Sequence, residues 1–343
     1  MLLVRPTHPG WAIVVVLCAV TGVQAQTSSH YPHEQLRLPA TLRTRPVVSA
    51  LAVSPDGHLA ASGGDDHLVR VWSLPDAQLR FTLRGHQDWV RDVAFDRSGR
   101  LLATGGDDRT IRLWNTQNGV LLATLDNLGQ AVSSLDIRRD GRELAVVGLG
   151  DEILLFDLAA VRISGRLAAT PDQRAVAYSP DGSQLAAGGR DGKIRIWRTA
   201  DRTPLQEIDA HRRRVRTLDY SADGTKLAAA GEDRTISVWE TATGRNLASM
   251  RAPTGCFTAV VFTSADEVAT GGSDNVIRIW DLASGRQARM FLAHRGSVAT
   301  LAYDSTKTRL ISGSFDTSIR VWNLDDTDVV RRPNPGRAEH PPR

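Results

Sequence analysis

The chain has 343 residues, of which 41% are hydrophobic, 23% charged and 6% aromatic, with 42 basic and 38 acidic side chains. This composition excludes a collagen, a disordered acidic chain and a membrane protein with many spans. Because carboxylates are interspersed with the arginines and no long basic tract stands alone, we expect no nucleic-acid partner.

Residues 1–25 have the pattern of a secretory signal peptide. Arg5 and His8 precede the apolar run 11–20, and small residues stand three positions and one position before an expected cut after Ala25. The run is too short to span a bilayer, which disfavours the alternative of a retained anchor. We therefore expect an exported protein, periplasmic or extracellular, with no membrane span after cleavage.

The chain has two cysteines, Cys18 and Cys256. Cleavage after Ala25 removes the first, so the mature chain can form no intrachain disulfide. The spacing of Cys and His does not fit a zinc site, and we expect no metal and no cofactor.

Aromatic residues that end an apolar-polar-apolar run recur every 41 or 42 residues. They are Trp72, Trp114, Phe156, Trp197, Trp239, Trp280 and Trp322. A period this regular indicates repeated supersecondary units. Each period holds segments with strand-like alternation, such as 90–95 and 110–114, separated by turns rich in Pro, Asp and Gly, such as 54–57. Four short strands per period without a helical segment predict an all-β fold of radially arranged antiparallel sheets.

Residues 45–324 resemble the WD40 family. The resemblance rests on Gly85-His86, on the turn sequences and on the run from Asp108 to Trp114, which recurs in five other repeats, and Trp280-Asp281 supplies the dipeptide of the family name. It implies a seven-bladed WD40 β-propeller with four antiparallel strands per blade, named a to d outward from the centre. It also implies a protein that binds another macromolecule.

The resemblance further implies a hydrogen-bonded tetrad in each complete blade, made of a loop His, a strand-b Ser or Thr, a turn Asp and a strand-c Trp. Such a closed chain satisfies buried polar groups and holds the loop on the blade. The complete sets are His86, Thr104, Asp108 and Trp114 in the second repeat, and His294, Ser312, Asp316 and Trp322 in the seventh.

The other repeats depart from the tetrad. The fifth keeps His211, Asp233 and Trp239 but has Ala229 on strand b, and the first, fourth and sixth lack the loop His. The third lacks the His too and has Val146, Gly150 and Phe156 at the remaining places. We expect the third blade to depend on its neighbours for order.

Equivalent residues in different repeats are held apart by a closed ring. The His residues therefore do not predict a metal site, and no two turn Asp residues are singled out as a catalytic acid and base. No phosphate-binding loop or nucleophile elbow is present. We expect a protein that is not an enzyme and has no catalytic residues. The alternative is an extracytoplasmic, hydrolase-like propeller enzyme with its site at the central channel.

Five arginines stand two positions before the strand-c Trp. They are Arg70, Arg112, Arg195, Arg278 and Arg320. Because they share a strand face with the Trp, we expect their guanidinium groups to lie flat against aromatic or apolar neighbours of the adjacent blade.

The resemblance implies that the loops before strand a, and the starts of strand a, lie on the top face around the channel. The candidate partner-binding residues there are Trp89, Arg91, Arg174, Arg190, Arg212, Arg214 and Arg216. We expect them to bind a protein or another acidic macromolecule, since Arg suits bidentate contact with carboxylates. A solvated charged loop, and a Trp packed under its own loop, are the alternatives. The predicted function is an exported, monomeric scaffold for protein-protein interaction.

Both chain ends flank the repeats. The N-terminal segment 26–44 is expected to close the ring by pairing with the last blade, with Gln35 to Leu42 as the missing fourth strand, because an open ring leaves a strand edge unpaired. Asp328 to Arg332 is the rival for that place. Residues 325–343, rich in Pro and Arg, are predicted to be disordered.

Overall fold

The computed structural model describes residues 33–36, 46–126, 128–292 and 294–325, and the statements below concern these residues. They form 28 strands and, within these ranges, no helix. Accordingly, this part of the chain contains no helix long and apolar enough to cross a membrane. The predicted signal peptide, residues 1–25, and the tail from residue 326 onward lie outside the described residues.

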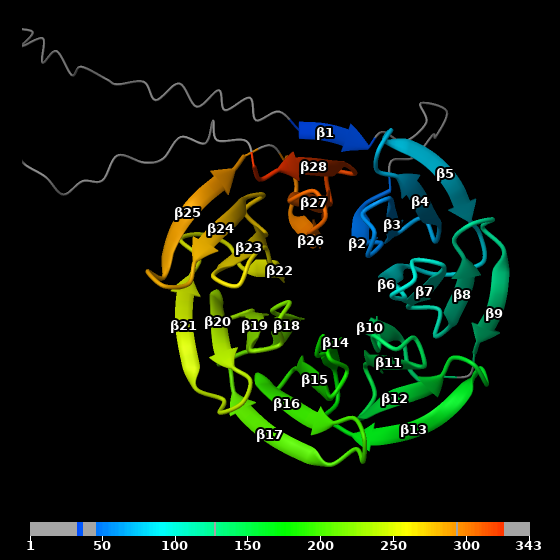
Figure 1. Cartoon of the computed structure of the whole chain (residues 1–343), viewed down its shortest axis with the longest axis horizontal. Coiled ribbons are helices and arrows are strands. Elements are labelled where there is room, and N and C mark those ends of the chain that lie inside the picture. The colour runs from blue at the N-terminus through cyan, green and yellow to red at the C-terminus, as the bar shows by residue number, and fades with distance from the viewer. Residues whose placement is uncertain (1–32, 37–45, 127, 293, 326–343) are drawn as a thin grey trace, which may run out of the picture. The chain divides into compact units, whose positions relative to one another are not determined.

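The strands form seven four-stranded sheets, which we call blades 1 to 7 in chain order (Figure 1). Strand a of the seven blades is β2 (Val48–Val53), β6 (Val90–Phe95), β10 (Val132–Ile137), β14 (Gln173–Tyr178), β18 (Val215–Tyr220), β22 (Phe257–Phe262) and β26 (Val298–Asp304). Strand b is β3 (Leu59–Gly64), β7 (Leu101–Gly106), β11 (Glu143–Gly148), β15 (Gln184–Gly189), β19 (Lys226–Gly231), β23 (Glu267–Gly272) and β27 (Arg309–Ser314).

The two outer positions complete each blade. Strand c is β4 (Val69–Ser73), β8 (Ile111–Asn115), β12 (Glu152–Asp157), β16 (Lys193–Arg198), β20 (Thr235–Glu240), β24 (Ile277–Asp281) and β28 (Ile319–Asn323). Strand d is β5 (Gln78–Leu83), β9 (Leu121–Leu125), β13 (Arg162–Ala168), β17 (Pro204–Asp209), β21 (Asn246–Arg251) and β25 (Arg286–Phe291), with β1 (His33–Leu36) in blade 7.

The a strands of consecutive blades contact one another around a closed circle, in which β2 of blade 1 also contacts β26 of blade 7. The predicted all-β, seven-bladed propeller with four antiparallel strands per blade is therefore confirmed. Because neighbouring strands run antiparallel, the turns between a and b lie on one rim, here called the bottom face. The turns between b and c, and the loops that enter strand a, lie on the opposite rim, the top face.

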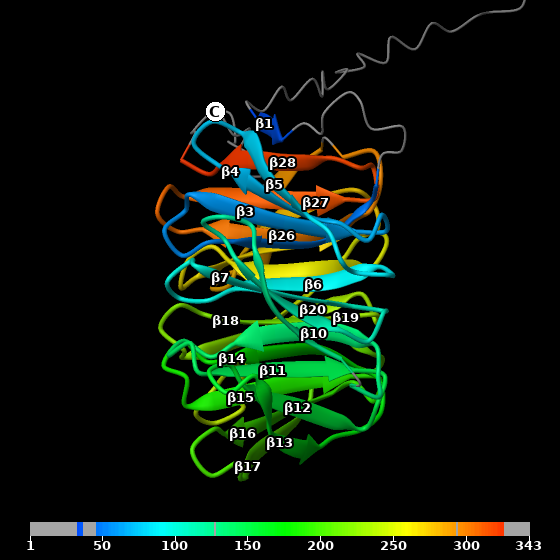
Figure 2. The same ribbon diagram turned by 90° about the vertical axis from the view of Figure 1, so that its right-hand side faces the viewer.

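Blade 7 takes its outer strand from the beginning of the chain. β1 pairs antiparallel with β28, with Leu36 opposite Ile319, and both views show the two strands side by side (Figures 1 and 2). Leu36 is buried in the cluster between blades 7 and 1. The described part of this strand, residues 33–36, shares Gln35 and Leu36 with the expected segment Gln35 to Leu42, and residues 37–42 lie outside the described part. The rival segment Asp328 to Arg332 lies outside it as well.

Each interface between neighbouring blades holds one cluster of buried apolar side chains. Strand b is buried on both faces in every blade and is rich in Ala and Gly, because side chains of the neighbouring blades leave little room beside it. A Cβ atom at Gly63 would lie 2.5 Å from Val90 Cγ1 of the next blade, and one at Gly313 would lie 2.5 Å from Val48 Cγ1. The core thus consists of seven blade interfaces that fix the rim loops.

Candidate functional site

The two tetrads expected in blades 2 and 7 have the same geometry. In blade 2, His86 Nδ1 lies 2.8 Å from Asp108 Oδ2, and His86 Nε2 lies 2.8 Å from the Thr104 hydroxyl, which accepts the Trp114 indole N–H at 3.0 Å. In blade 7, the corresponding contacts of His294, Ser312, Asp316 and Trp322 are 2.9, 2.7 and 2.9 Å.

The turn carboxylates of these tetrads are held ionised. Burial alone would raise the pKa of Asp108, but hydrogen bonds from His86 and from the Gln87 N–H outweigh it and hold the pKa well below its usual range. Asp316 has a lowered pKa for the same reasons, with His294 and Ser318 as donors. These residues fasten the loop before strand a to the turn between b and c, which makes the top face of blades 2 and 7 rigid.

Blade 5 has an incomplete tetrad. His211 Nδ1 lies 2.9 Å from the Thr235 hydroxyl and 3.2 Å from Asp233 Oδ1. On the other side of the ring, buried His211 Nε2 has no hydrogen-bond partner among the described residues, because Ala229 supplies no hydroxyl. Burial lowers the pKa of His211, so this ring stays neutral more readily than an exposed histidine.

The strand-c arginines of blades 1, 4 and 6 replace the missing loop His. Arg70 binds Asp66 at 2.5 Å, Arg195 binds Asp191 at 2.8 Å and Arg278 binds Asp274 at 2.6 Å, each across the turn between b and c. The expectation that these guanidinium groups lie flat on apolar neighbours missed this pairing. The sequence did indicate this ion pair: in the repeats that lack the loop His, an Asp stands four residues before the Arg.

Blade 3 uses an amide instead. The Gln130 side chain accepts the Gly150 N–H at 2.6 Å and donates to the Glu152 carbonyl at 3.2 Å, so it ties the loop before β10 to the turn after β11. A Cβ atom at position 150 would lie 2.6 Å from Gln130 Oε1, which explains the glycine at this turn. Gln130 was not among the residues predicted from the sequence, because the tetrad motif has a His, and not an amide, in the loop before strand a.

A central channel of about 430 Å³ is lined by strand a of all seven blades. Each a strand carries a β-bulge near its top end, where one extra residue interrupts the pairing with strand b. A bulge redirects a side chain, and all seven extra residues line the channel. They are Ser49, Arg91, Ser133, Arg174, Arg216, Thr258 and Ala299.

Three of the seven predicted partner-binding residues, Arg91, Arg174 and Arg216, therefore occupy equivalent bulges around the top of the channel. They are not free cations: Arg91 pairs with Asp107, Arg174 with Asp172 at 2.6 Å, and Arg216 with Glu232 at 3.4 Å.

The other four candidates lie on the loops of the same face. Arg214 bridges Asp172 at 2.8 Å and Glu232 at 3.1 Å, which joins blades 4 and 5. Arg190 and Arg212 are exposed, and within the described ranges neither has a carboxylate at ion-pair distance. Trp89 is half-buried, with the Arg91 guanidinium 4.5 Å from its ring centroid. The top face of blades 2, 4 and 5 thus carries a network of paired arginines and carboxylates. Its cations without a carboxylate partner in the described structure, Arg190 and Arg212, lie on the loops.

The channel also holds three carboxylates that were not among the predicted site residues. Asp92 accepts the Leu135 N–H at 2.9 Å, Asp136 accepts the Tyr178 N–H at 2.7 Å and Asp219 accepts the Phe262 N–H at 2.7 Å, each from the next blade. Desolvation raises the pKa of Asp92 to about 6 and those of Asp136 and Asp219 to about 7. The sequence did contain a signal for these carboxylates, since they are charged residues on the strands expected to line the channel.

Among the described residues, no group of three or more His, Cys, Asp or Glu side chains is placed to hold a metal ion. The channel lining likewise contains no His or Cys. The three loop histidines lie in different blades, 2, 5 and 7, and each contacts the turn Asp of its own blade.

Comparison with known proteins identifies the repeats. A family model described as WD40, the WD domain or G-beta repeat, matches six segments, residues 37–73, 77–115, 168–198, 202–240, 244–281 and 285–323. The chain is also similar to a probable serine/threonine-protein kinase, PkwA, of Thermomonospora curvata, with 43% identity over 67 residues. That similarity covers 20% of this chain and 9% of the relative, so the chain matches less than a tenth of the relative's length.

Proposed function

Because the chain belongs to the WD40 repeat family, we propose that it is an exported scaffold that binds a protein partner through the top face of its propeller. Propellers of this family are typically scaffolds without enzyme activity. A rigid disc with a broad rim suits this role, since little conformational freedom is lost when a partner docks on it.

The observation that carries the proposal is the ring of bulged residues at the top of the channel. Arg91, Arg174 and Arg216 line it from blades 2, 4 and 5, and ion pairs to Asp107, Asp172 and Glu232 hold them in place. Preorganised charges of this kind favour one docking geometry over others.

Trp89 and the exposed arginines add the features of a binding surface. An aromatic ring covered by a guanidinium group, as Trp89 is by Arg91, offers both apolar area and charge to a partner. Arg190 and Arg212 supply positive charge beyond the paired network, so the proposed partner surface is acidic opposite blades 4 and 5. Binding should weaken with salt, because these two groups are exposed.

Affinity capture from the exported fraction tests the top face. The variant carrying Trp89→Ala and Arg212→Glu is expected to lose the partner that the wild type retains. Arg214 is left unchanged because it bridges two carboxylates and its reversal would disturb the fold. The matched control is Arg162→Glu on the outer strand β13, an exposed arginine that should not matter. Equal capture by both variants would contradict docking on this face.

Export has its own test. Mass spectrometry of the protein recovered from its native host is expected to show a mature N-terminus at or near Gln26. A chain that still begins at Met1 and stays in the cytoplasmic fraction would contradict export, but it would not contradict the proposal that the propeller is a scaffold.

A hydrolase-like site in the channel is the second candidate. It is favoured by the raised pKa of Asp136, since a carboxyl group that titrates near neutral pH can act as a general acid. A screen of hydrolase substrates with the wild type and Asp136→Asn separates the two functions: activity that disappears in the variant would support the enzyme.

A further inference from the structure

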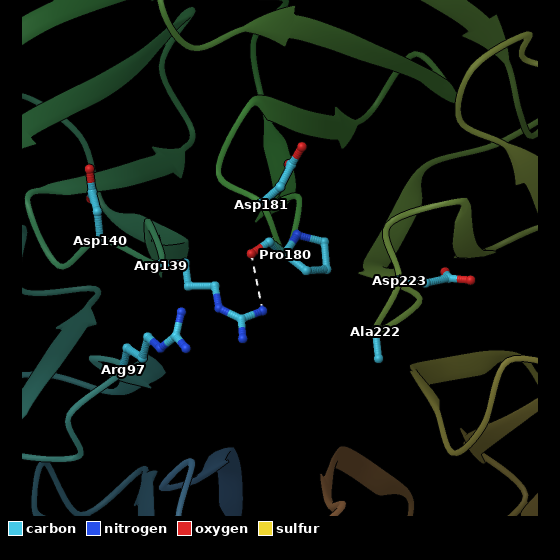
Figure 3. A pocket seen from close by; sticks show the side chains of 7 residues that line it. All are labelled: Arg97, Arg139, Asp140, Pro180, Asp181, Ala222 and Asp223. Atoms are coloured by element: carbon cyan, nitrogen blue, oxygen red, sulfur yellow. Dashed lines mark hydrogen bonds between the residues drawn. The ribbon is translucent and has the colours of Figure 1, made fainter.

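The bottom mouth of the channel contains a second charged surface, which the proposed function does not use. Its central cavity, about 460 Å³, is lined by turns between strands a and b of blades 2 to 5. An adjoining cavity of about 510 Å³ reaches inward toward strand a of blades 2 to 4. The two cavities share Arg97, Arg139 and Pro180 (Figure 3).

Arg97 and Arg139 are exposed, and neither has an ion pair to any carboxylate in the described part of the chain. Both side chains line the same two cavities, and Figure 3 shows them beside each other, with Arg139 the nearer to Pro180. Arg139 Nη1 donates to the Pro180 carbonyl at 3.2 Å, which orients one of the two guanidinium groups. Two like charges on neighbouring turns repel each other unless an anion lies between them.

The acidic residues that line the central cavity do not supply that anion. Asp140 pairs with Arg138 at 2.9 Å, and the carboxylates of Asp140, Asp181 and Asp223 point away from the two arginines in Figure 3. Asp181 accepts the Ser179 hydroxyl at 2.6 Å, and Asp223 accepts the Ser221 hydroxyl at 2.6 Å. These carboxylates therefore stabilise their own turns.

The inner cavity adds an apolar wall beside the arginines. It is made of Pro55, Phe95, Ile137, Tyr178 and Pro180. Asp136 also lines it, with its carboxylate bound to the Tyr178 N–H, and desolvation raises its pKa to about 7, so it opposes an incoming anion less than an ordinary aspartate would. The mouth thus combines two unpaired cations with apolar surface next to them.

We propose that Arg97 and Arg139 form a carboxylate-binding site for a peptide whose carboxylate adjoins an apolar side chain. Each guanidinium can hold a carboxylate through two parallel hydrogen bonds, and the wall of Phe95 and the prolines takes the apolar group. A peptide C-terminus has this combination, and so does an internal acidic residue beside an apolar one. Inorganic phosphate lacks the apolar part. The site lies on the face opposite the top-face surface and is independent of the proposed function.

Fluorescence anisotropy of short labelled peptides tests the site. The probe is dye-labelled Gly-Gly-Gly-Leu with a free C-terminal carboxylate, compared with its C-terminal amide and with Gly-Gly-Glu-Leu amide, which carries the carboxylate on a side chain. Binding by the free acid alone assigns the site to a C-terminus, and binding by both acids assigns it to any carboxylate beside an apolar group. The amide without Glu should bind at least about tenfold more weakly, since charge-assisted bonds are lost.

Paired substitutions locate the binding. The variant Arg97→Gln with Arg139→Gln is expected to weaken binding of the free acid about tenfold or more, whereas Arg100→Gln with Arg142→Gln should change it less than about twofold. The control arginines are exposed on the same two turns but do not line either cavity. The proposal is wrong if the wild type shows no saturable binding, if both double variants bind alike, or if inorganic phosphate displaces the peptide at equal concentration.

Discussion

Completing the tetrad of blade 5 should stabilise the protein. Ala229 is fully buried at the place where blades 2 and 7 carry Thr104 and Ser312. The His211 and Trp239 ring centroids are 6.0 Å apart, and those of His294 and Trp322, which enclose the Ser312 hydroxyl, are 6.2 Å apart. The gap beside Ala229 is therefore the right size for one added oxygen.

The substitution Ala229→Ser would place a hydroxyl between the two rings. Its O–H can donate to His211 Nε2, which has no hydrogen-bond partner in the described structure, and its oxygen can accept the Trp239 indole N–H. Each neutral hydrogen bond contributes about 1 kcal/mol, part of which offsets the loss of an apolar contact. We expect a net gain of about 1 kcal/mol and a rise in Tm of about 2–4 °C.

Differential scanning calorimetry of three variants tests this expectation. Ala187→Ser lies on the equivalent strand position of blade 4, where Trp197 is present but the loop His is missing, so a smaller gain is expected. Ala228→Ser is buried on the opposite face of β19, against blade 6, and should lower the Tm because its hydroxyl has no partner there. If Ala229→Ser lowers the Tm as much as Ala228→Ser, the added hydroxyl does not complete a tetrad in blade 5 and the reasoning is wrong.

The fold could be predicted because each blade is specified by a local pattern. The Trp period, the turns and the strand alternation repeat within about 42 residues, and each blade then needs only a like neighbour to bury its faces. The tetrad of His86, Thr104, Asp108 and Trp114 was implied by the resemblance to the WD40 family, whose motif these residues match one by one in this repeat. The pairing of Asp66 with Arg70 is equally local, since the two residues are four positions apart, but the tetrad motif does not contain it.

The charge of the candidate site could not be predicted from one repeat at a time. Arg214 binds Asp172, which is 42 residues away at the equivalent height of the neighbouring blade. Asp136 accepts the Tyr178 N–H across the same kind of boundary, also 42 residues away. Such contacts depend on the bulge in strand a and on the angle between blades, neither of which a repeat alignment contains. Four of the six arginines among the candidate partner-binding residues are therefore members of an ion-pair network.

Three further predictions concern the tetrad, the closing strand and the channel carboxylates. Asp108→Ala should cost about 1–3 kcal/mol in the free energy of unfolding, because His86 and the Gln87 N–H lose their acceptor, whereas exposed Asp151→Ala should cost little; equal losses in denaturant titrations would contradict the tetrad assignment. Deleting residues 26–42 removes β1 and buried Leu36 and should lower the Tm sharply, whereas truncation after residue 326 should not, and the reverse result would favour a C-terminal closing strand. The last concerns pH. Desolvation raises the pKa of Asp136 to about 7 from an ordinary 3.8, so between these values the folded state holds a proton that the unfolded chain has released, and the contribution of Asp136 to stability falls as the pH rises through this window. Asp136→Asn keeps an acceptor for the Tyr178 N–H but cannot ionise, so its Tm should fall less than that of the wild type between about pH 5 and pH 8; an equal or steeper fall in the variant would show that Asp136 is ionised at neutral pH and that water in the channel solvates it.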